Sequence, residues 1–189
     1  MGEEALLIVD RLSAGYGHPV VGPISFSARR GEVIAVQGPN GVGKSTLLNA
    51  IAGSARVFSG SITRRAGVRV SHQQQAALPL DDVPLSGREL LALTGADARG
   101  LPDWIVPLID KRLDRLSGGQ RQFMQIWACL KAPVDVVLLD EPANNLDPQG
   151  MQYLEAQIRD MRATHAMLVV SHDRRFLDHI RTRALDLGA

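Results

Sequence analysis

The chain has 189 residues, of which 45% are hydrophobic and 22% charged, and these proportions indicate one globular domain with a substantial core. A formal net charge of +1 gives no overall electrostatic case for binding nucleic acid or a membrane surface, and no stretch approaches the roughly 20 apolar residues of a membrane span. The single cysteine, Cys129, excludes an intramolecular disulfide, and its apolar surroundings predict a buried, inert thiol.

The N-terminal residues predict a small antiparallel β subdomain. Residues 5–9 form an apolar strand candidate, and residues 24–28 alternate apolar side chains with serines, as in a half-buried edge strand. The turn-forming residues 13–19 separate the two strands. The acidic start, residues 1–4, lacks the basic and apolar regions of a signal peptide, so we expect a cytoplasmic protein.

A phosphate-binding motif follows the next predicted strand, residues 33–36, and opens a predicted helix over residues 46–52. It has the spacing Gly, four residues, Gly, Lys, Ser/Thr, in the run Gly38-Pro39-Asn40-Gly41-Val42-Gly43-Lys44-Ser45-Thr46. Glycines let successive backbone N–H groups point at phosphate oxygens, and the helix N-terminus adds partial positive charge. We expect Lys44 to reach the β- and γ-phosphates and the Ser45 hydroxyl to coordinate Mg²⁺. The alternative is a glycine-rich turn that carries an ordinary lysine.

The middle of the chain changes from strands to helices. Residues 60–63 and 67–71 predict short strands. Residues 86–94 and 103–113 have helical spacing of apolar side chains, with prolines that break the segments, and a longer helix is predicted over residues 120–131. We therefore expect a small helical subdomain.

A second glycine-containing run precedes that longer helix, Leu116-Ser117-Gly118-Gly119-Gln120-Arg121-Gln122. Its backbone N–H groups, the serine hydroxyl and the helix dipole would together make a second anion-binding site. The alternative interpretation is an ordinary helix with a serine N-cap.

Two adjacent carboxylates, Asp140 and Glu141, end the apolar run of residues 134–140, which predicts a buried parallel strand. Ligand sites of α/β sheets lie at the carboxyl ends of parallel strands, so this pair is the expected acidic partner of Lys44. We expect Asp140 to hold Mg²⁺, directly or through water, and Glu141 to polarise the attacking water as general base. The alternative is a helix N-cap beside a solvated acid.

The last third alternates strands and helices, with helices predicted over residues 148–162 and 174–179 and strands over residues 166–170 and 184–186. This alternation predicts a mainly parallel core sheet. The predicted fold is therefore an α/β P-loop NTPase with an N-terminal antiparallel β subdomain and a short α-helical subdomain. One domain, residues 1–189, would comprise the antiparallel strands with the phosphate loop, the helical subdomain with the second run, and the rest of the α/β core, at residues 1–75, 76–130 and 131–189.

With these motifs in this order, the chain resembles the ATP-binding cassette (ABC) ATPases, and the run from Leu116 to Gln122 matches the signature motif of that family. In that family the signature of one subunit covers the γ-phosphate held by the phosphate loop of another subunit. The resemblance therefore implies ATP and Mg²⁺ as ligands and a head-to-tail dimer, expected to be a homodimer, that sandwiches two ATP. The signature residues of one copy would then contact nucleotide bound to the other: Ser117, Gly118, Gly119 and Gln120.

The resemblance assigns roles to further residues. Tyr16 matches the aromatic side chain that stacks on adenine, and His172 matches the switch histidine that hydrogen-bonds the γ-phosphate. Gln75 best matches the glutamine that senses the γ-phosphate and Mg²⁺, with Gln73 as the second choice. Asp147 matches the acid of the turn through which two ATPase subunits communicate, although it is also placed to cap the following helix.

The leading functional hypothesis is the ATPase subunit of a membrane transporter, peripheral at the inner face of the cell membrane. A cassette without spans should dimerise and couple to separate permease subunits, and residues 75–85 are faintly similar to metal-ion import cassettes. The alternative is a soluble, translation-associated ATPase that acts on ribosomes, which residues 169–178 resemble. Direct nucleic-acid binding is not expected for the transporter. A non-hydrolysing scaffold is disfavoured by the presence of Lys44, Asp140, Glu141 and His172.

Overall fold

The protein is built on two β-sheets, and the computed structural model describes residues 4–74 and 84–188. The larger sheet has five strands in the order β5-β6-β7-β3-β8, and every neighbouring pair is parallel. Its three central strands, β6, β7 and β3, are almost wholly buried, which explains their continuous apolar sequences. The strands span Val70–Gln73 (β5), Val136–Asp140 (β6), Ala166–Val170 (β7), Val33–Gln37 (β3) and Arg183–Asp186 (β8).

The smaller sheet is antiparallel, with the order β2-β1-β4, and β2 is an edge strand as the serine alternation predicts. Its strands span Leu7–Gly15 (β1), Pro19–Ala28 (β2) and Arg56–Arg64 (β4). The predicted turn over residues 13–19 is too long, because β1 continues to Gly15 and β2 begins at Pro19. Strand β1 stays paired with β2 on one side and β4 on the other despite its register shifts. This pairing depends on distant residues, so local turn propensity does not predict it.

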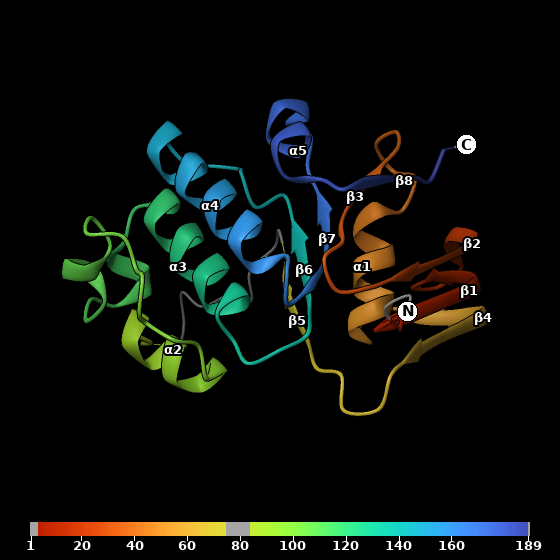
Figure 1. Cartoon of the computed structure of the whole chain (residues 1–189), viewed down its shortest axis with the longest axis horizontal. Helices are drawn as coiled ribbons and strands as arrows, with labels where there is room; N and C mark the ends of the chain where they lie inside the picture. Colours follow the sequence, from red (N-terminus) through yellow and green to blue (C-terminus); the bar gives the residue numbers. More distant parts are fainter. Residues whose placement is uncertain (1–3, 75–83, 189) are drawn as a thin grey trace.

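Helix α1, Lys44–Ala52, lies between the two sheets and buries Leu47, Leu48 and Ile51 against both (Figure 1). The opposite face of the parallel sheet is covered by α3 (Gly118–Leu130), α4 (Pro148–Met161) and α5 (Arg174–Ile180). The parallel sheet therefore has helices on both faces, as a doubly covered α/β sheet requires. The predicted mainly parallel core with an N-terminal antiparallel sheet is confirmed.

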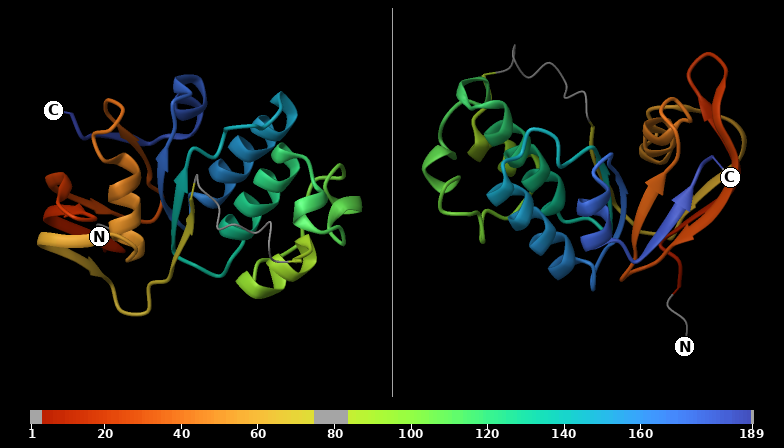
Figure 2. Two further views of the ribbon diagram at one scale, coloured as in Figure 1. Left: turned by 180° about the vertical axis from the view of Figure 1, so that it is seen from behind. Right: turned by 90° about the horizontal axis from the view of Figure 1, so that it is seen from above.

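A helical unit lies at the end of the molecule opposite the antiparallel sheet (Figure 2). Helix α2, Gly87–Thr94, packs with α3 around its own apolar cluster, which is centred on Phe123 and Trp127. The predicted helix over residues 103–113 is wrong: two short 3-10 helices, Val106–Leu108 and Leu113–Arg115, occupy this region. Pro107 lacks the N–H that an α-helix needs, so apolar spacing alone could not extend a helix there.

Two further observations concern the helices. Cys129 on α3 is buried, and burial raises the pKa of its thiol to about 12, in agreement with the inert thiol predicted from the sequence. Within residues 4–74 and 84–188, no helix is both long and apolar enough to cross a membrane.

Candidate nucleotide site

The phosphate loop connects the end of β3 to the start of α1. Three of its glycines, Gly38, Gly41 and Gly43, have φ values of 139°, 80° and 101°, a region that side chains other than hydrogen disfavour. Gly43 also lies so close to β2 that a Cβ atom there would be 2.7 Å from the Cβ of Val21. The loop therefore needs glycine for both its backbone conformation and its packing, which is the construction expected of an anion-binding nest.

Lys44 is held in place by the loop that precedes it. Its Nζ donates to the carbonyl oxygens of Gly38 at 2.9 Å and Pro39 at 3.0 Å, and the residue is only 8% exposed. An ammonium group has three donors, so one N–H remains for a ligand. The charge is thus fixed at the mouth of the loop before any phosphate arrives, which lowers the cost of ordering it on binding.

Asp140 lies at the carboxyl end of β6, beside the first turn of α1. It is 4% exposed, and burial raises the pKa of its carboxyl, an effect opposed by a hydrogen bond with the Ser45 side chain and by the charge of Lys44. Its Oδ1 is buried without a hydrogen-bond partner among the described residues. A carboxylate oxygen left unpaired next to a serine hydroxyl fits a hard, oxygen-preferring cation such as Mg²⁺.

Glu141 follows directly and has a left-handed backbone, with φ of 53°, which is rare for a residue with a side chain. Its Oε2 accepts the backbone N–H of His172 at 3.1 Å. The Nε2 of His172 lies 3.3 Å from Oε1, close enough for attraction but without hydrogen-bond alignment. Glu141 is 3% exposed, and burial raises the pKa of its carboxyl against the opposing hydrogen bond and charge of His172.

These groups share one open pocket of about 340 Å³. The structure thus brings together the predicted phosphate loop, acidic pair and switch histidine, and adds Val20 and Val170 to the lining, which no motif indicates. The members of the pocket are Val20, Asn40, Gly41, Gly43, Lys44, Ser45, Thr46, Asp140, Glu141, Val170 and His172.

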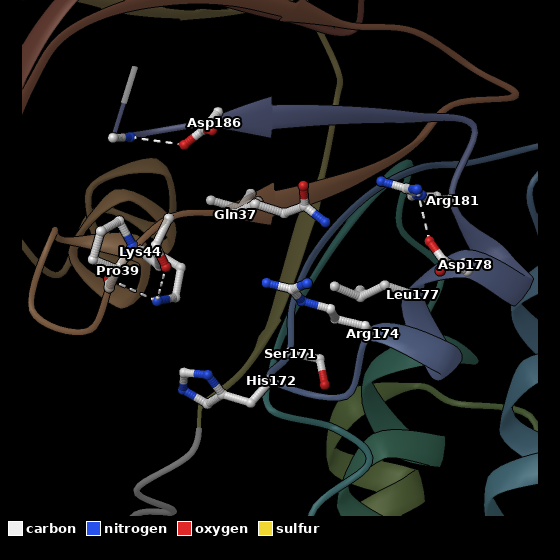
Figure 3. A pocket seen from close by; sticks show the side chains of 13 residues that line it. Gln37, Pro39, Lys44, Ser171, His172, Arg174, Leu177, Asp178, Arg181 and Asp186 are labelled. Carbon is white, nitrogen blue, oxygen red and sulfur yellow. Dashed lines mark hydrogen bonds and ion pairs between the residues drawn. The ribbon is translucent and has the colours of Figure 1, made fainter.

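A second cavity, of about 840 Å³, borders the phosphate loop and shares Lys44 and His172 with the first (Figure 3). The Arg174 guanidinium points into it toward the space between Gln37 and His172, and Arg181 is paired with Asp178 at 2.7 Å. Gln37 and Arg174 also border the site, although no sequence motif indicates either residue. Their proximity follows from the parallel packing of β3 beside β7, which no local spacing in the sequence indicates.

Tyr16 and the glutamines lie at the margin of the site. Tyr16 is 58% exposed, and its hydroxyl accepts a hydrogen bond from Asn49 Nδ2 at 2.7 Å. It is not part of the lining of the phosphate pocket. Gln73, at the end of β5, is buried and donates from Nε2 to the carbonyl of Gln74 at 2.9 Å. Gln75, the preferred candidate for the γ-phosphate sensor, lies outside the described residues.

The predicted signature forms a separate group. Ser117 caps α3 and makes a reciprocal pair of hydrogen bonds with Gln120. Gly119 lies against the turn before α4, where a Cβ atom would be 2.5 Å from the carbonyl oxygen of Asn145, whereas the space around Gly118 is open. In the same turn, Asp147 caps α4 by accepting the N–H of Gly150 at 2.7 Å, so the capping alternative for this residue is observed.

The signature group borders its own pocket of about 320 Å³. None of its lining residues belongs to the phosphate pocket, so within the described part of one chain the signature does not face Lys44. The lining comprises Trp104, Ser117, Gly119, Gln120, Asn145, Leu146, Asp147 and Gln149.

A glycine-rich loop between the parallel strand β3 and a helix, with an acidic pair at the carboxyl end of β6, two strands along the same sheet, defines a P-loop nucleotide-binding protein. A family profile described as "ABC transporter" matches residues 21–144, and the chain belongs to this family of ATP-binding proteins. The predicted family is confirmed.

Two kinds of relative share about a third of their residues with this chain. The zinc import ATP-binding protein ZnuC of Jannaschia sp. (strain CCS1) is 34% identical over 178 residues, covering 89% of this chain and 73% of ZnuC. The energy-dependent translational throttle protein EttA of Escherichia coli (strain K12) is 32% identical over 197 residues, covering 97% of this chain. This chain spans only 35% of the length of that EttA.

Solved structures show the same fold. The ATP-binding subunit of an ABC transporter superimposes with a TM-score of 0.81 at 23% identity, covering 97% of this chain and 86% of that one. The archaeal ribosome recycling factor aABCE1, solved in complex with a ribosomal stalk protein, gives a TM-score of 0.81 at 27% identity. That match covers 98% of this chain but 37% of the factor.

Proposed function

We propose that this protein is the ATP-binding and hydrolysing subunit of a membrane transporter, and that residues 1–189 act as one ATPase domain in a head-to-tail homodimer. The observation that carries the proposal is the separation of two half-sites on one chain. Lys44 lies in one pocket and Ser117 in another that shares no lining residue with it. Two copies arranged head to tail would bring Ser117 to Gly119 of each over the phosphate loop of the other.

The chemistry we propose for this site is hydrolysis of the β–γ phosphate bond. Ser45 and Asp140, with Gln75 as the predicted third ligand, would hold Mg²⁺, which neutralises phosphate charge when bound. Lys44 directs its free N–H at the phosphate oxygens. Glu141 lies in a buried environment that raises its pKa, which makes its carboxylate a better proton acceptor for the attacking water.

His172 would position that base and contact the γ-phosphate. Its backbone N–H fixes Glu141 Oε2, while its ring, whose side chain is 62% exposed, faces the open pocket. The same residue can therefore hold the base through its main chain and reach a ligand through its ring. These two separate contacts, one from the main chain and one from the ring, support the switch role inferred from the family resemblance.

A mostly apolar groove of about 670 Å³ supplies a surface for a permease partner. It lies where α1 and β5 meet α2 and α3, and Leu90, Ala128 and Val134 contribute to its lining. The ZnuC relative, of which this chain covers 73%, supports a metal-ion importer as the machine, with the ATPase bound at the inner face of the cell membrane. The metal-import resemblance of residues 75–85 falls mostly outside the described residues.

The sandwich is tested with Glu141→Gln, which should bind ATP without hydrolysing it. We expect the variant to elute as a dimer in saturating Mg-ATP and as a monomer without nucleotide, measured by size-exclusion chromatography with light scattering. Glu141→Gln combined with Lys44→Ala is the matched control and should stay monomeric. A Glu141→Gln variant that remains monomeric while binding Mg-ATP would contradict the head-to-tail dimer.

A second candidate function, a translation-associated ATPase that acts on ribosomes, is favoured by one observation. The alignment with EttA covers 97% of this chain, including residues 169–178. Partner isolation separates the two functions: the tagged protein should co-purify with a multi-span membrane protein from detergent extracts. ATP-dependent co-sedimentation of Glu141→Gln with ribosomes, and no membrane partner, would favour the second function.

A further inference from the structure

We propose that Asn49 is a positioning residue that holds Tyr16 in place as the platform for the nucleotide base. The inference rests on the proposed function, because it takes ATP as the ligand. Asn49 belongs to none of the motifs in the sequence, yet its side chain joins three segments of the chain. These are the loop after β1, the residues after α1 and the residue that follows β5.

The main chain of Asn49 is fixed by the end of α1. Its carbonyl oxygen accepts the N–H of Ser54 at 2.8 Å, in the turn that Gly53 makes with φ of 91°. Lys44 begins the same helix five residues earlier, about 7.5 Å along the axis at 1.5 Å per residue. One rigid helix therefore carries the phosphate-binding lysine at one end and the carboxamide of Asn49 near the other.

The orientation of the Asn49 carboxamide follows from its neighbours. Its Oδ1 accepts from Gln74 Nε2 at 3.1 Å and from the Ser54 hydroxyl at 3.2 Å. With the oxygen occupied by two donors, the NH₂ group must face the opposite way, where it donates to the Tyr16 hydroxyl at 2.7 Å. In this orientation of the carboxamide the three contacts are mutually consistent.

The tether matters because Tyr16 has little else to hold it. The side chain is 58% exposed and follows the last residue of β1, Gly15, in a loop of three residues. An aromatic ring that stacks on a base must be ordered on binding, and ordering a free side chain lowers affinity. The bond from Asn49 removes part of that freedom in advance and places the ring beside the helix that holds the phosphates.

The hydrogen bond from Gln74 links Asn49 to the run of three glutamines, Gln73 to Gln75. Gln74 directly precedes Gln75, the predicted γ-phosphate sensor, and follows Gln73 at the end of β5. Tyr16 and Gln74 therefore both hydrogen-bond the side chain of Asn49, on one turn of α1. We infer that Asn49 fixes the separation between the base end and the phosphate end of the site.

The experiment compares ATP with inorganic tripolyphosphate, which has phosphates but no base. Asn49→Ala and Tyr16→Phe each remove the tether, from opposite ends, and Tyr16→Phe keeps the ring. Loss of one neutral hydrogen bond predicts an affinity for Mg-ATP lower by about two- to tenfold in either variant. Their affinity for Mg-tripolyphosphate, measured by calorimetry, should equal that of the unchanged protein. The double variant should bind Mg-ATP no worse than the weaker single variant.

The controls separate this inference from the proposed function. Lys44→Ala should weaken the binding of both ligands by a similar factor, and an unchanged protein that binds neither would overturn the ATP site itself. Equal loss of ATP and tripolyphosphate in Asn49→Ala would show damage to α1 rather than to the base platform, and would overturn the inference. Unaltered or tighter ATP binding by Tyr16→Phe, or additive losses in the double variant, would also overturn the positioning role of Asn49.

Discussion

Burial and the charge of a bound cation would act in opposite directions on the pKa of the two carboxylates at the carboxyl end of β6, Asp140 and Glu141. Asp140 and Glu141 are 4% and 3% exposed, and burial is the largest influence on each pKa, raising both. A bound cation would favour the charged forms that burial disfavours. At neutral pH these two buried carboxylates therefore lower the folding stability, as grouped buried charges at functional sites usually do.

Replacing Glu141 with glutamine should raise stability while removing activity. A raised folded-state pKa means that the folded protein binds more protons than the unfolded chain, so stability falls as pH rises through that pKa and stays lower above it. The neutral amide of the Glu141→Gln variant avoids this loss at pH 7. We expect a higher midpoint in thermal unfolding and at least about a hundredfold slower ATP hydrolysis. A lower melting temperature for the variant, measured without nucleotide, would contradict this account.

Replacing Lys44 with alanine should lower the affinity for Mg-ATP by roughly tenfold to a hundredfold, the range for hydrogen bonds to a charged group. The measurement is titration with a fluorescent ATP analogue. Arg175→Ala is the matched control, because Arg175 is an exposed cation that lines neither cavity at the phosphate loop. Equal affinity in Lys44→Ala and the unchanged protein would refute the phosphate site.

At the scale of elements, α3 and the turn before α4 meet at a close backbone contact. Gly119 approaches the carbonyl oxygen of Asn145, a residue with a φ of 63°. Gly118, one position earlier, faces open space. The signature therefore cannot move relative to the turn of residues 144–147 without breaking this fit. In the proposed dimer, the two elements would approach the partner as one surface.

The two adjacent glycines provide a paired test of that contact. Gly119→Ala would place a Cβ atom 2.5 Å from the carbonyl oxygen of Asn145, so the helix start and the turn must separate. We expect ATP-driven dimerisation of the Glu141→Gln protein to be lost when Gly119→Ala is added, with binding of Mg-ATP by the monomer unchanged. Adding Gly118→Ala instead should disturb dimerisation less. Equal behaviour of the two variants would refute the close-contact explanation.

At the scale of the whole molecule, α1, β5 and the helical unit meet at the apolar groove, and His72 contributes to its lining. His72 lies on β5, and both of its ring nitrogens are buried without hydrogen-bond partners among the described residues. Burial lowers the pKa of its imidazole from 6.5 to about 4. The ring therefore stays neutral in the folded protein at pH values where the unfolded chain would protonate it.

This difference predicts acid sensitivity of the fold. Between pH 6.5 and about 4 the unfolded chain binds a proton at His72 that the folded protein does not, so the free energy of unfolding should fall as pH falls through this window. His72→Phe removes the group and should flatten the dependence, measured by urea unfolding at several pH values. Asp140 and Glu141 contribute in the opposite direction and are common to both proteins. Parallel curves for the two proteins would contradict the prediction.

Local sequence patterns were enough to predict much of the fold and the site. The glycine spacing, the apolar runs of β3, β6 and β7, and the caps at Ser117 and Asp147 act within a few residues, so the phosphate loop, the parallel sheet and the helix starts were predictable. The family followed from the order of these motifs. The structure of residues 103–113 was not predictable from apolar spacing, since Pro107 and the packing of the helical unit decide that segment.

Which distant residues share a surface could be seen in the tertiary structure but not predicted from the sequence. The bond from Asn49 to Tyr16 spans 33 positions, and the approach of Gly119 to Asn145 joins α3 to a turn beyond β6. The same packing separates Ser117 from Lys44 within one chain. Such contacts depend on how strands order themselves in a sheet and on which faces of helices are buried. Those choices come from burying apolar surface over the whole molecule, so no local spacing in the sequence encodes them.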